Sequence, residues 1–279
     1  MGGSGVLHLV GLGLGPAGMS VGALRALRGC ATIFVERYTA PASDGALARW
    51  EQGLGRPLLV LSRRQVEQGT SILAAAAAGP TALCVVGDPL AATTHQELRL
   101  TALEAGLAVH YWPGTSILTV APSLAGLHHS KFGRLVTLPF PQPGFVPTSP
   151  VEHLLDNLRR GLHTLVLLDL PEDGSRTMTV SEAAAILWAT AQRLTQERGD
   201  GVAPGLDDGT AIVAIASAGW PDASVVAAPL GRWRGPDPPT VGPTPHCLVV
   251  VGALHFQEER ALARWSGPAP LRLRAGDGR

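Results

Sequence analysis

The chain has 279 residues, of which 46% are apolar and 16% charged, and its formal net charge at pH 7 is zero. This length suits one large or two modest domains with a substantial core. The neutral charge argues against a dedicated nucleic-acid binder, which normally presents a basic face. Because no apolar run reaches about 18 residues, no membrane span is expected.

The three cysteines, Cys30, Cys84 and Cys247, lie far apart in apolar surroundings. They lack metal-ligand spacing such as C-x-x-C, so no metal site is predicted. We expect buried free thiols in a reducing compartment, which points to the cytoplasm. The opening residues, MGGSG, have neither the charged nor the apolar region of a signal peptide.

Short apolar runs alternate with helical patterns through the first part of the chain. Strands are predicted at residues 6–12, 32–36, 58–61, 81–86 and 109–112, and helices at 19–29, 45–53, 66–78 and 96–105. This alternation is typical of a parallel sheet with helices on both faces. Ligands of such sheets bind at the carboxyl ends of the strands.

The regular alternation of strands and helices ends at about residue 113. Helices are predicted at 116–127, 151–160 and 180–196, and strands at 135–139, 164–170, 210–216 and 247–252, the last two being the final strands. Residues 139–150 and 236–245 are rich in proline, which indicates loops. The predicted fold class is therefore α/β with two α/β lobes: an N-terminal lobe with a parallel sheet (1–112), a C-terminal lobe (113–265) and a tail (266–279). A cofactor cleft is expected between the lobes.

A glycine-rich turn, GLGLG at residues 11–15, follows the first predicted strand. Glycines at this point let backbone amides approach a ligand. One interpretation is a nicotinamide-dinucleotide site of an oxidoreductase. The glycine spacing departs from G-x-G-x-x-G, and Glu36 is the nearest candidate for the acidic residue that would bind the ribose.

The strand predicted at 81–86 ends in GDPLAATTH, residues 87–95. Gly87 permits close approach of a ligand to the backbone, and the following proline stiffens the turn. Threonine hydroxyls and free amides at the next helix start can meet a polar ligand. Asp88 can equally serve as a turn or helix-capping residue. We expect His95 to begin a helix without taking part in chemistry.

Together with seven other segments, this motif resembles the diphthine synthase family, S-adenosylmethionine-dependent methyltransferases of the tetrapyrrole methylase-like class. The others are VLHLVGLGLG at 6–15, ERYT at 36–39, PGTSI at 113–117, KFGR at 131–134, GLHTLVLLDL at 161–170, ASAG at 216–219 and PH at 245–246. They follow the family's order along nearly the whole chain. Ser217 stands where the family commonly has arginine, and Met19 and Ser20 depart from its Asp-Ile-Thr.

The resemblance implies S-adenosyl-L-methionine as the cofactor and S-adenosyl-L-homocysteine as its product. It implies eight cofactor contacts: Leu14, Asp88, Ala91, Ser116, Ile117, Leu168, Ala218 and His246. Three of these have a plain structural alternative: Asp88 as a turn or capping residue, Ser116 as a helix cap, and His246 as a surface residue. His163 is expected to be a structural partner. No catalytic residue is assigned.

The resemblance also implies the reaction and the partners. Its acceptor is a histidine of translation elongation factor 2 that already carries an aminocarboxypropyl group, and repeated methylation gives diphthine in diphthamide biosynthesis. A homodimer is implied, without direct contact to nucleic acid or membrane. Two alternatives stay open. One is a methyltransferase of tetrapyrrole or corrin precursors, whose carboxylates Arg63, Arg64 and Arg134 could bind. The other is a non-catalytic regulator that binds the cofactor or the elongation factor.

Overall fold

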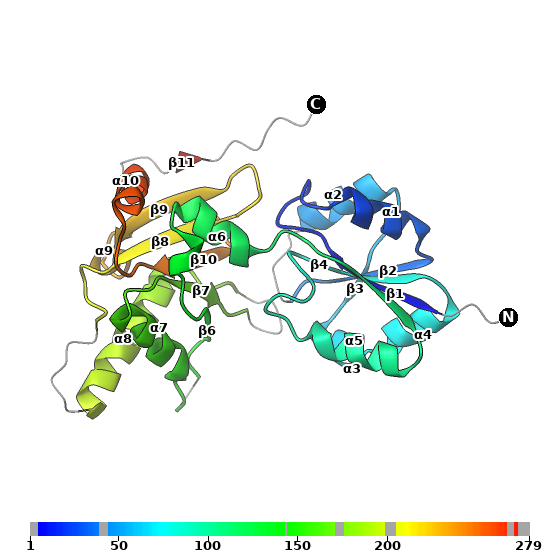
Figure 1. The fold of residues 1–279 in the computed structure, drawn as a ribbon, viewed down its shortest axis with the longest axis horizontal. Helices are drawn as coiled ribbons and strands as arrows, with labels where there is room; N and C mark the ends of the chain where they lie inside the picture. Colours follow the sequence, from blue (N-terminus) through cyan, green and yellow to red (C-terminus); the bar gives the residue numbers. More distant parts are fainter. Residues whose placement is uncertain are drawn as a thin grey trace. The chain divides into compact units, whose positions relative to one another are not determined.

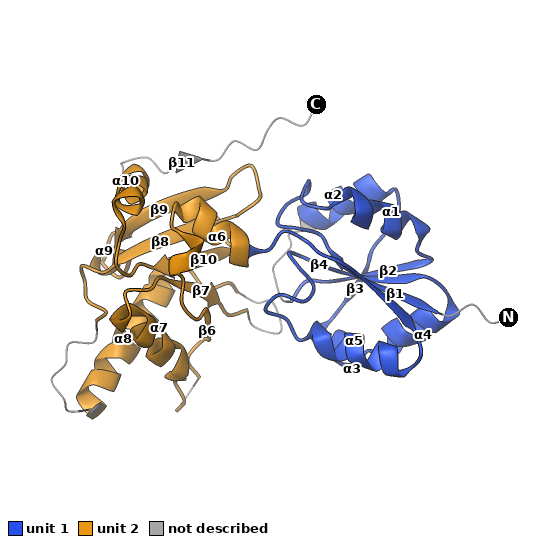
Figure 2. Cartoon of the chain, viewed as in Figure 1, with its two compact units in different colours: residues 1–117, 172–174 blue, residues 118–171, 175–279 orange. Residues whose placement is uncertain are grey.

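The computed structural model describes residues 5–38, 44–142, 144–170, 176–198, 205–266 and 271–272 (Figure 1). The chain forms two compact units (Figure 2), with residues 1–117 and 172–174 in unit 1 and residues 118–171 and 175–279 in unit 2. The division falls after Ile117, whereas the sequence placed it after Trp112. The reason is that the segment after Trp112 packs back onto unit 1, where Gly114 touches Gly11.

Unit 1 is built on a parallel sheet with the strand order β3-β2-β4-β1-β5. Its strands are β1 (Val6–Gly11), β2 (Thr32–Glu36), β3 (Leu59–Leu61), β4 (Thr81–Val85) and β5 (Ala108–Trp112). Helices α1 (Val21–Gly29) and α2 (Asp44–Leu54) cover one face, and α3 (Arg63–Gln68), α4 (Thr70–Ala78) and α5 (His95–Glu104) cover the other (Figure 1). The prediction of a parallel sheet covered on both faces is confirmed.

One predicted helix of unit 1 is in fact two. The sequence predicted a single helix over 66–78, but Gly69 adopts φ +66° and separates α3 from α4. In this left-handed conformation glycine ends α3, since its amide bonds back to the carbonyl of Gln65. Ser62 and Gln65 form a capping box at the start of α3, four residues before the predicted helix start at Val66.

Unit 2 is built on a mostly antiparallel sheet with the order β11-β9-β8-β10-β7-β6, in which β6 and β7 are parallel. Its strands are β6 (Val136–Leu138), β7 (Thr164–Leu168), β8 (Ala211–Ala216), β9 (Ser224–Pro229), β10 (His246–Val250) and β11 (Leu271–Arg272). Its helices are α6 (Ile117–Ala125, which begins at the last residue of unit 1), η1 (His129–Lys131), α7 (Ser149–Arg159), α8 (Val180–Arg198), α9 (Leu230–Trp233) and α10 (Phe256–Trp265). Helices α7 and α8 lie on one face of the sheet, and α6 and α10 lie on the other (Figure 1).

Sequence reasoning missed five elements of unit 2, among them the short helices η1 and α9. Strand β9 was not expected, because its sequence SVVAAP is rich in residues that disfavour strands; it forms through pairing with β8 along its whole length. Helix α10 was also missed, and so was β11, which pairs with β9 inside the predicted tail. The remaining residues of that tail, 267–270 and 273–279, lie outside the described residues.

The predicted free thiols are confirmed, since Cys30, Cys84 and Cys247 are buried and form no disulfide. Burial raises the pKa of the Cys247 thiol to about 12 and also raises the pKa values of Cys30 and Cys84. Among the helices in the described ranges, none combines the length and apolarity needed to cross a membrane.

Candidate active site

The carboxyl ends of β1, β4 and β5 approach so closely that only glycine fits between them. A Cβ atom on Gly11 would lie 2.7 Å from the carbonyl oxygen of Gly87, and one on Gly114 would lie 2.8 Å from the Cα of Gly11. Gly114 follows β5, and Gly87 follows β4, so three turns meet at this edge of the parallel sheet. This is the edge at which such sheets bind ligands.

Backbone hydrogen bonds join the turn after β1 to the turn after β4. The amide of Gly13 donates to the carbonyl of Gly87 over 3.1 Å, and the amide of Gly87 donates to the carbonyl of Gly13 over 2.8 Å. The amide of Gly13 is therefore not free for a pyrophosphate. Glu36 is fully buried and accepts a hydrogen bond from the amide of Tyr38, so it is not placed to bind a ribose. Both observations weigh against the nicotinamide interpretation.

The space over Gly87 is open, in contrast to that over its two glycine neighbours. A Cβ atom on Gly87 would meet only Cδ2 of Leu14 at 3.8 Å and the carbonyl oxygen of Thr115 at 3.9 Å. Ser116 and Ile117 follow Thr115 directly, and all of these residues belong to unit 1. The structure thus brings Leu14, Asp88 and the carbonyl of Thr115, the residue that precedes Ser116, together around Gly87.

Asp88 is buried and holds the turns of β4 and β5 together. Its Oδ1 accepts the amide of Leu90 at 2.9 Å, and its Oδ2 accepts the hydroxyl of Tyr111 at 2.6 Å and the amide of Gly114 at 3.0 Å. The structural alternative from the sequence, a turn residue, is therefore correct for Asp88. A carboxylate held in this way also leaves a fixed negative charge at the strand ends, which suits a cationic ligand.

The second half of the motif at 87–95 is held by His95. This residue is buried; its Nδ1 lies 2.9 Å from the carbonyl oxygen of Pro89 and its Nε2 lies 3.1 Å from the hydroxyl of Tyr38. His95 begins α5, as expected, and its two hydrogen bonds also hold the loop in place. Ala91 lies on this braced loop and is half-buried.

The three candidate residues of unit 2 gather at one end of its sheet. The antiparallel register places Cys247 opposite Leu167 and His246 opposite Ala216. Leu168 at the end of β7 therefore lies near His246 at the start of β10, and Ala218 follows β8 at the same end. Sequence spacing alone could not show this, because it depends on the pairing of three strands.

One ring nitrogen of His246 has no hydrogen-bond partner among the described residues. Its Nε2 lies 3.0 Å from the carbonyl oxygen of Gly242, whereas its Nδ1 is buried and has no hydrogen-bond partner within the described part of the chain. Burial lowers the pKa of His246, so the ring is neutral at pH 7. Because Nε2 donates its proton to the carbonyl of Gly242, Nδ1 is the nitrogen that accepts hydrogen bonds. His246 is therefore not the plain surface residue that its position before a strand suggested.

Ser217, which stands where arginine is common in the family, has a local structural role. Its backbone lies in the left-handed region with φ +48°, and its side chain is buried. Its hydroxyl donates to the carbonyl of Pro243 over 3.2 Å, and its amide donates to the carbonyl of Pro245 over 3.0 Å. These bonds hold the turn after β8, which contains Ser217 and Ala218, against residues 243–245, the segment directly before β10.

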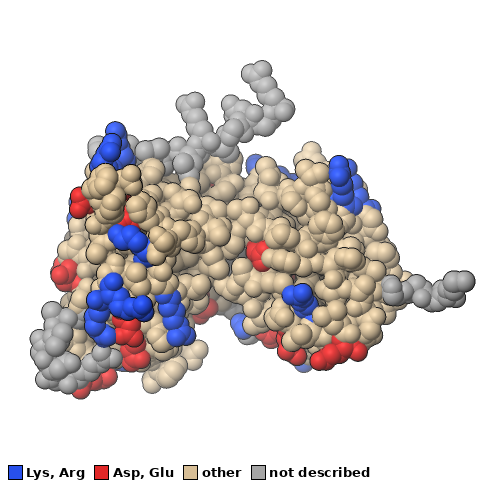
Figure 3. Space-filling view, viewed as in Figure 1, with Lys and Arg blue, Asp and Glu red and all other residues tan. Residues whose placement is uncertain are grey.

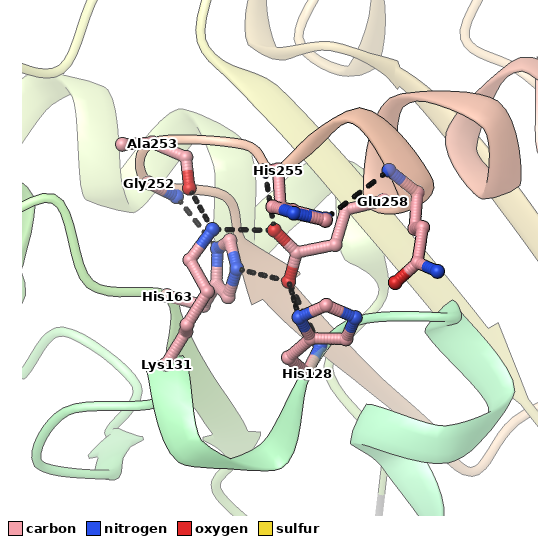
Figure 4. A network of polar contacts seen from close by, with 8 residues as sticks. His128, Lys131, His163, Gly252, Ala253, His255 and Glu258 are labelled. Carbon is pink, nitrogen blue, oxygen red and sulfur yellow. Dashed lines mark hydrogen bonds and ion pairs between the residues drawn. The ribbon is translucent and has the colours of Figure 1, made fainter.

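A second polar cluster of unit 2 surrounds Glu258 (Figure 4). The carboxylate of Glu258 is fully buried; it is paired with Lys131 and accepts from the backbone amides of His128 and His255, each at 2.8 Å. Nε2 of His163 lies 3.1 Å from the same carboxylate. Because Nδ1 of His163 accepts the amide of Gly252 at 3.0 Å, Nε2 carries the proton. The expected structural role of His163 is confirmed.

This cluster perturbs the titration of its members. Burial alone would raise the pKa of Glu258, but Lys131, the two backbone amides and His163 lower it to about 2. Burial lowers the pKa of His163. The cluster lies at the start of β7 and beyond the end of β10, at the opposite end of the sheet from Leu168 and His246. It therefore anchors η1 and α10 and is not part of the candidate site.

In the KFGR segment at 131–134, close packing against Asn157 requires glycine at position 133. A Cβ atom on Gly133 would overlap with the side-chain amide of Asn157, which is buried in α7. The side-chain oxygen of Asn157 accepts the backbone amide of Arg134 over 3.2 Å, and its side-chain nitrogen donates to the carbonyl of Arg134 over 2.8 Å.

Within the described ranges, no three His, Cys, Asp or Glu side chains gather as a metal-binding group would require.

Comparison with known proteins agrees with this architecture. The profile of the tetrapyrrole (corrin/porphyrin) methylases matches residues 6–233. The chain is 36% identical to a diphthine synthase of Methanothermobacter thermautotrophicus, over 94% of this chain and 96% of that protein. It is also 36% identical to a diphthine synthase of Methanosphaerula palustris, over 94% of this chain and 99% of that protein.

Solved structures show the same fold. A crystal structure of a diphthine synthase superposes with a TM-score of 0.79 at 28% identity, covering 94% of this chain and 96% of that one. A putative diphthine synthase from Entamoeba histolytica gives a TM-score of 0.80 at 26% identity, covering 95% and 100%. The fold and the matched profile define a methylase of the tetrapyrrole type. The chain belongs to this family and, within it, to the diphthine synthases, and it is an S-adenosylmethionine-dependent methyltransferase.

Each unit, taken by itself, carries groups at its strand ends that suit S-adenosylmethionine. In unit 1, Gly87 leaves open backbone beside Leu14, and Asp88 offers a negative charge to a sulfonium. In unit 2, Nδ1 of His246 is an acceptor that has no donor among the described residues. A ligand N–H or O–H would satisfy that nitrogen.

Proposed function

We propose that this protein methylates the modified histidine of translation elongation factor 2 to give diphthine, in diphthamide biosynthesis. The observation that carries the proposal is the similarity to diphthine synthases over 94% of the chain. The acceptor would be the amine of the aminocarboxypropyl group on that histidine. The eight expected cofactor contacts form part of the proposal, and the grouping of Leu14, Asp88 and the Thr115 carbonyl around Gly87 supports it.

S-Adenosylmethionine, when bound, supplies a methyl group that its positive sulfur has already activated. The protein's residues then need to bind and orient the reactants and to exclude water, with little acid–base machinery. Leu14, Ile117 and Leu168 would provide apolar contacts, and the small side chains of Ala91 and Ala218 would permit close approach. Asp88 would offset the positive charge, and His246 would accept a hydrogen bond.

The assembly and location of the protein complete the proposal. We expect a cytoplasmic homodimer that has no direct contact with nucleic acid. The buried free thiols support a reducing compartment. On the face drawn in Figure 3, positive and negative side chains lie intermixed, which supports the absence of a large basic surface there. Size measurement by light scattering tests the homodimer.

The proposed reaction is tested by transfer of labelled methyl from S-adenosylmethionine to elongation factor 2. The acceptor protein is isolated from cells that lack their own diphthine synthase, and mass spectrometry locates and counts the methyl groups. Methyl groups on the modified histidine are the expected result. Absence of transfer, with S-adenosylhomocysteine still bound, would exclude this acceptor and direct the search to tetrapyrroles.

The proposed cofactor contacts are tested by Asp88→Ala and Ser116→Trp. Both should weaken binding of S-adenosylhomocysteine in calorimetry, the first by removing a charge and a loop anchor, the second by filling space beside Gly87. Unchanged affinity in both variants would refute the proposed site.

A further inference from the structure

Tyr111 is an exposed aromatic residue whose hydroxyl is committed to a buried group. It lies on β5, an edge strand of unit 1, opposite Leu9 of β1, and its side chain is 41% exposed. Its hydroxyl donates to Oδ2 of Asp88 over 2.6 Å. Desolvation first, and then the hydrogen bond and negative charge of Asp88, raise the pKa of Tyr111 to about 12. The hydroxyl therefore remains a donor throughout the neutral range.

The bond from Tyr111 differs from the other two bonds to Asp88. Leu90 and Gly114 donate through backbone amides, so they follow the course of the chain. Tyr111 is the one side-chain donor to Asp88 in the described part of the chain. It acts on Oδ2, the oxygen that also receives Gly114, while Leu90 donates to Oδ1; donors on both oxygens together fix the rotation of the carboxylate.

We infer that Tyr111 is a positioning residue of the cofactor site: its hydroxyl orients the Asp88 carboxylate and so strengthens binding of S-adenosylmethionine. The inference rests on the proposed contact between Asp88 and the cofactor. A carboxylate that is already oriented loses little freedom when the ligand binds, which is the general advantage of a preorganised site. Tyr111 itself touches no reacting atom.

Tyr111→Phe isolates this bond, because it removes the hydroxyl and keeps the ring. We expect the Kd of S-adenosylhomocysteine in calorimetry to rise about tenfold, which corresponds to about 1.4 kcal/mol. The KM for S-adenosylmethionine should rise in the same proportion while kcat stays unchanged, since the bond is present before and during the reaction. An unchanged Kd would overturn the inference. A lower Kd would also overturn it, because the tyrosine would then compete with the cofactor for Asp88.

A double-mutant cycle tests whether Tyr111 acts through Asp88. Asp88→Asn alone should weaken S-adenosylhomocysteine binding, and adding Tyr111→Phe should then change the Kd by less than about twofold. A full tenfold effect of Tyr111→Phe in the Asp88→Asn background would overturn the inference. The proposed function is judged separately, by binding and methyl transfer of the wild-type protein.

Two further measurements separate positioning from general loss of structure. His110→Ala changes an exposed residue on the opposite face of the same strand, where the ring stacks on His8 at 5.2 Å; its Kd should equal that of the wild type. In the ligand-free Tyr111→Phe protein, hydrogen exchange should accelerate at the amides of Leu90 and Gly114, which share the Asp88 carboxylate. Faster exchange across all of unit 1 would instead show unfolding and would overturn the inference.

Discussion

Gly87 and Gly106 form a matched pair for testing where the cofactor lies. Both belong to unit 1 and both have positive φ angles, +79° and +76°. Alanine in this left-handed region costs roughly 1–2 kcal/mol. Gly87→Ala and Gly106→Ala should therefore lose similar amounts of folding free energy, irrespective of any role in binding.

The surroundings of the two added methyl groups differ. A Cβ atom on Gly106 meets nothing within 4 Å, whereas one on Gly87 enters the space bounded by Leu14 and the carbonyl of Thr115. If the cofactor approaches the backbone at Gly87, the methyl group displaces it. We expect Gly87→Ala to weaken S-adenosylhomocysteine binding at least tenfold, or about 1.4 kcal/mol, and Gly106→Ala to leave it unchanged.

Thermal unfolding and calorimetry on the same samples separate strain from contact. Each kcal/mol should lower the Tm by about 2–4 °C for a chain of this size, equally in both variants. Wild-type affinity in Gly87→Ala would refute the placement of the cofactor over Gly87. An equal loss of affinity in both variants would show that backbone strain, not contact, is responsible.

Three other substitutions test the supporting structure. Glu258→Gln should lower the free energy of unfolding at pH 7 by about 3 kcal/mol in urea titrations, since it breaks a buried pair with Lys131; an unchanged value would contradict this. In the wild type, that stability should be complete above about pH 4.5 and be lost as the pH falls toward 2, because only the folded state lowers the pKa of Glu258; Glu258→Gln should lack this loss. Gly133→Ala should lower the Tm by several degrees by displacing Asn157, and an unchanged Tm would refute the packing argument. His95→Ala should keep methyl transfer within about a hundredfold of wild type, or 2.7 kcal/mol, and a larger loss would assign His95 a role in chemistry.

The parallel half of the fold was accessible from the sequence because its central strands β1, β2 and β4 are buried on both faces. Such strands read as continuous apolar runs, and the predicted strand 32–36 coincides with β2. Strand β9 gave no such signal, since serine, alanine and proline occupy four of the six positions of SVVAAP. The break between α3 and α4 depends on the φ angle of Gly69, which a helical pattern does not reveal.

The part of the candidate site that lies directly after the strands of the parallel sheet was predictable from the sequence. Leu14 and Asp88 come after β1 and β4, and parallel strands bring their carboxyl ends together. The hydroxyl bond from Tyr111 to Asp88 was not foreseen, because it joins residues of two strands whose register is known only from the fold. Glu258 gave no signal either, since its side-chain partners His163 and Lys131 are 95 and 127 residues away in sequence.

The residues that stabilise unit 2 through Glu258 and the residues expected to bind the cofactor lie at opposite ends of its sheet. His163 directly precedes β7, and Gly252 follows the end of β10. Both residues therefore lie at the end of the sheet where Glu258 anchors α10. Leu168 and His246 lie at the other end of the same two strands. A change at Glu258 therefore acts on the anchoring of η1 and α10, one strand length away from the expected cofactor contacts. Below its unfolding temperature, Glu258→Gln should bind S-adenosylhomocysteine as the wild type does, and weaker binding there would show that the anchor also supports the site.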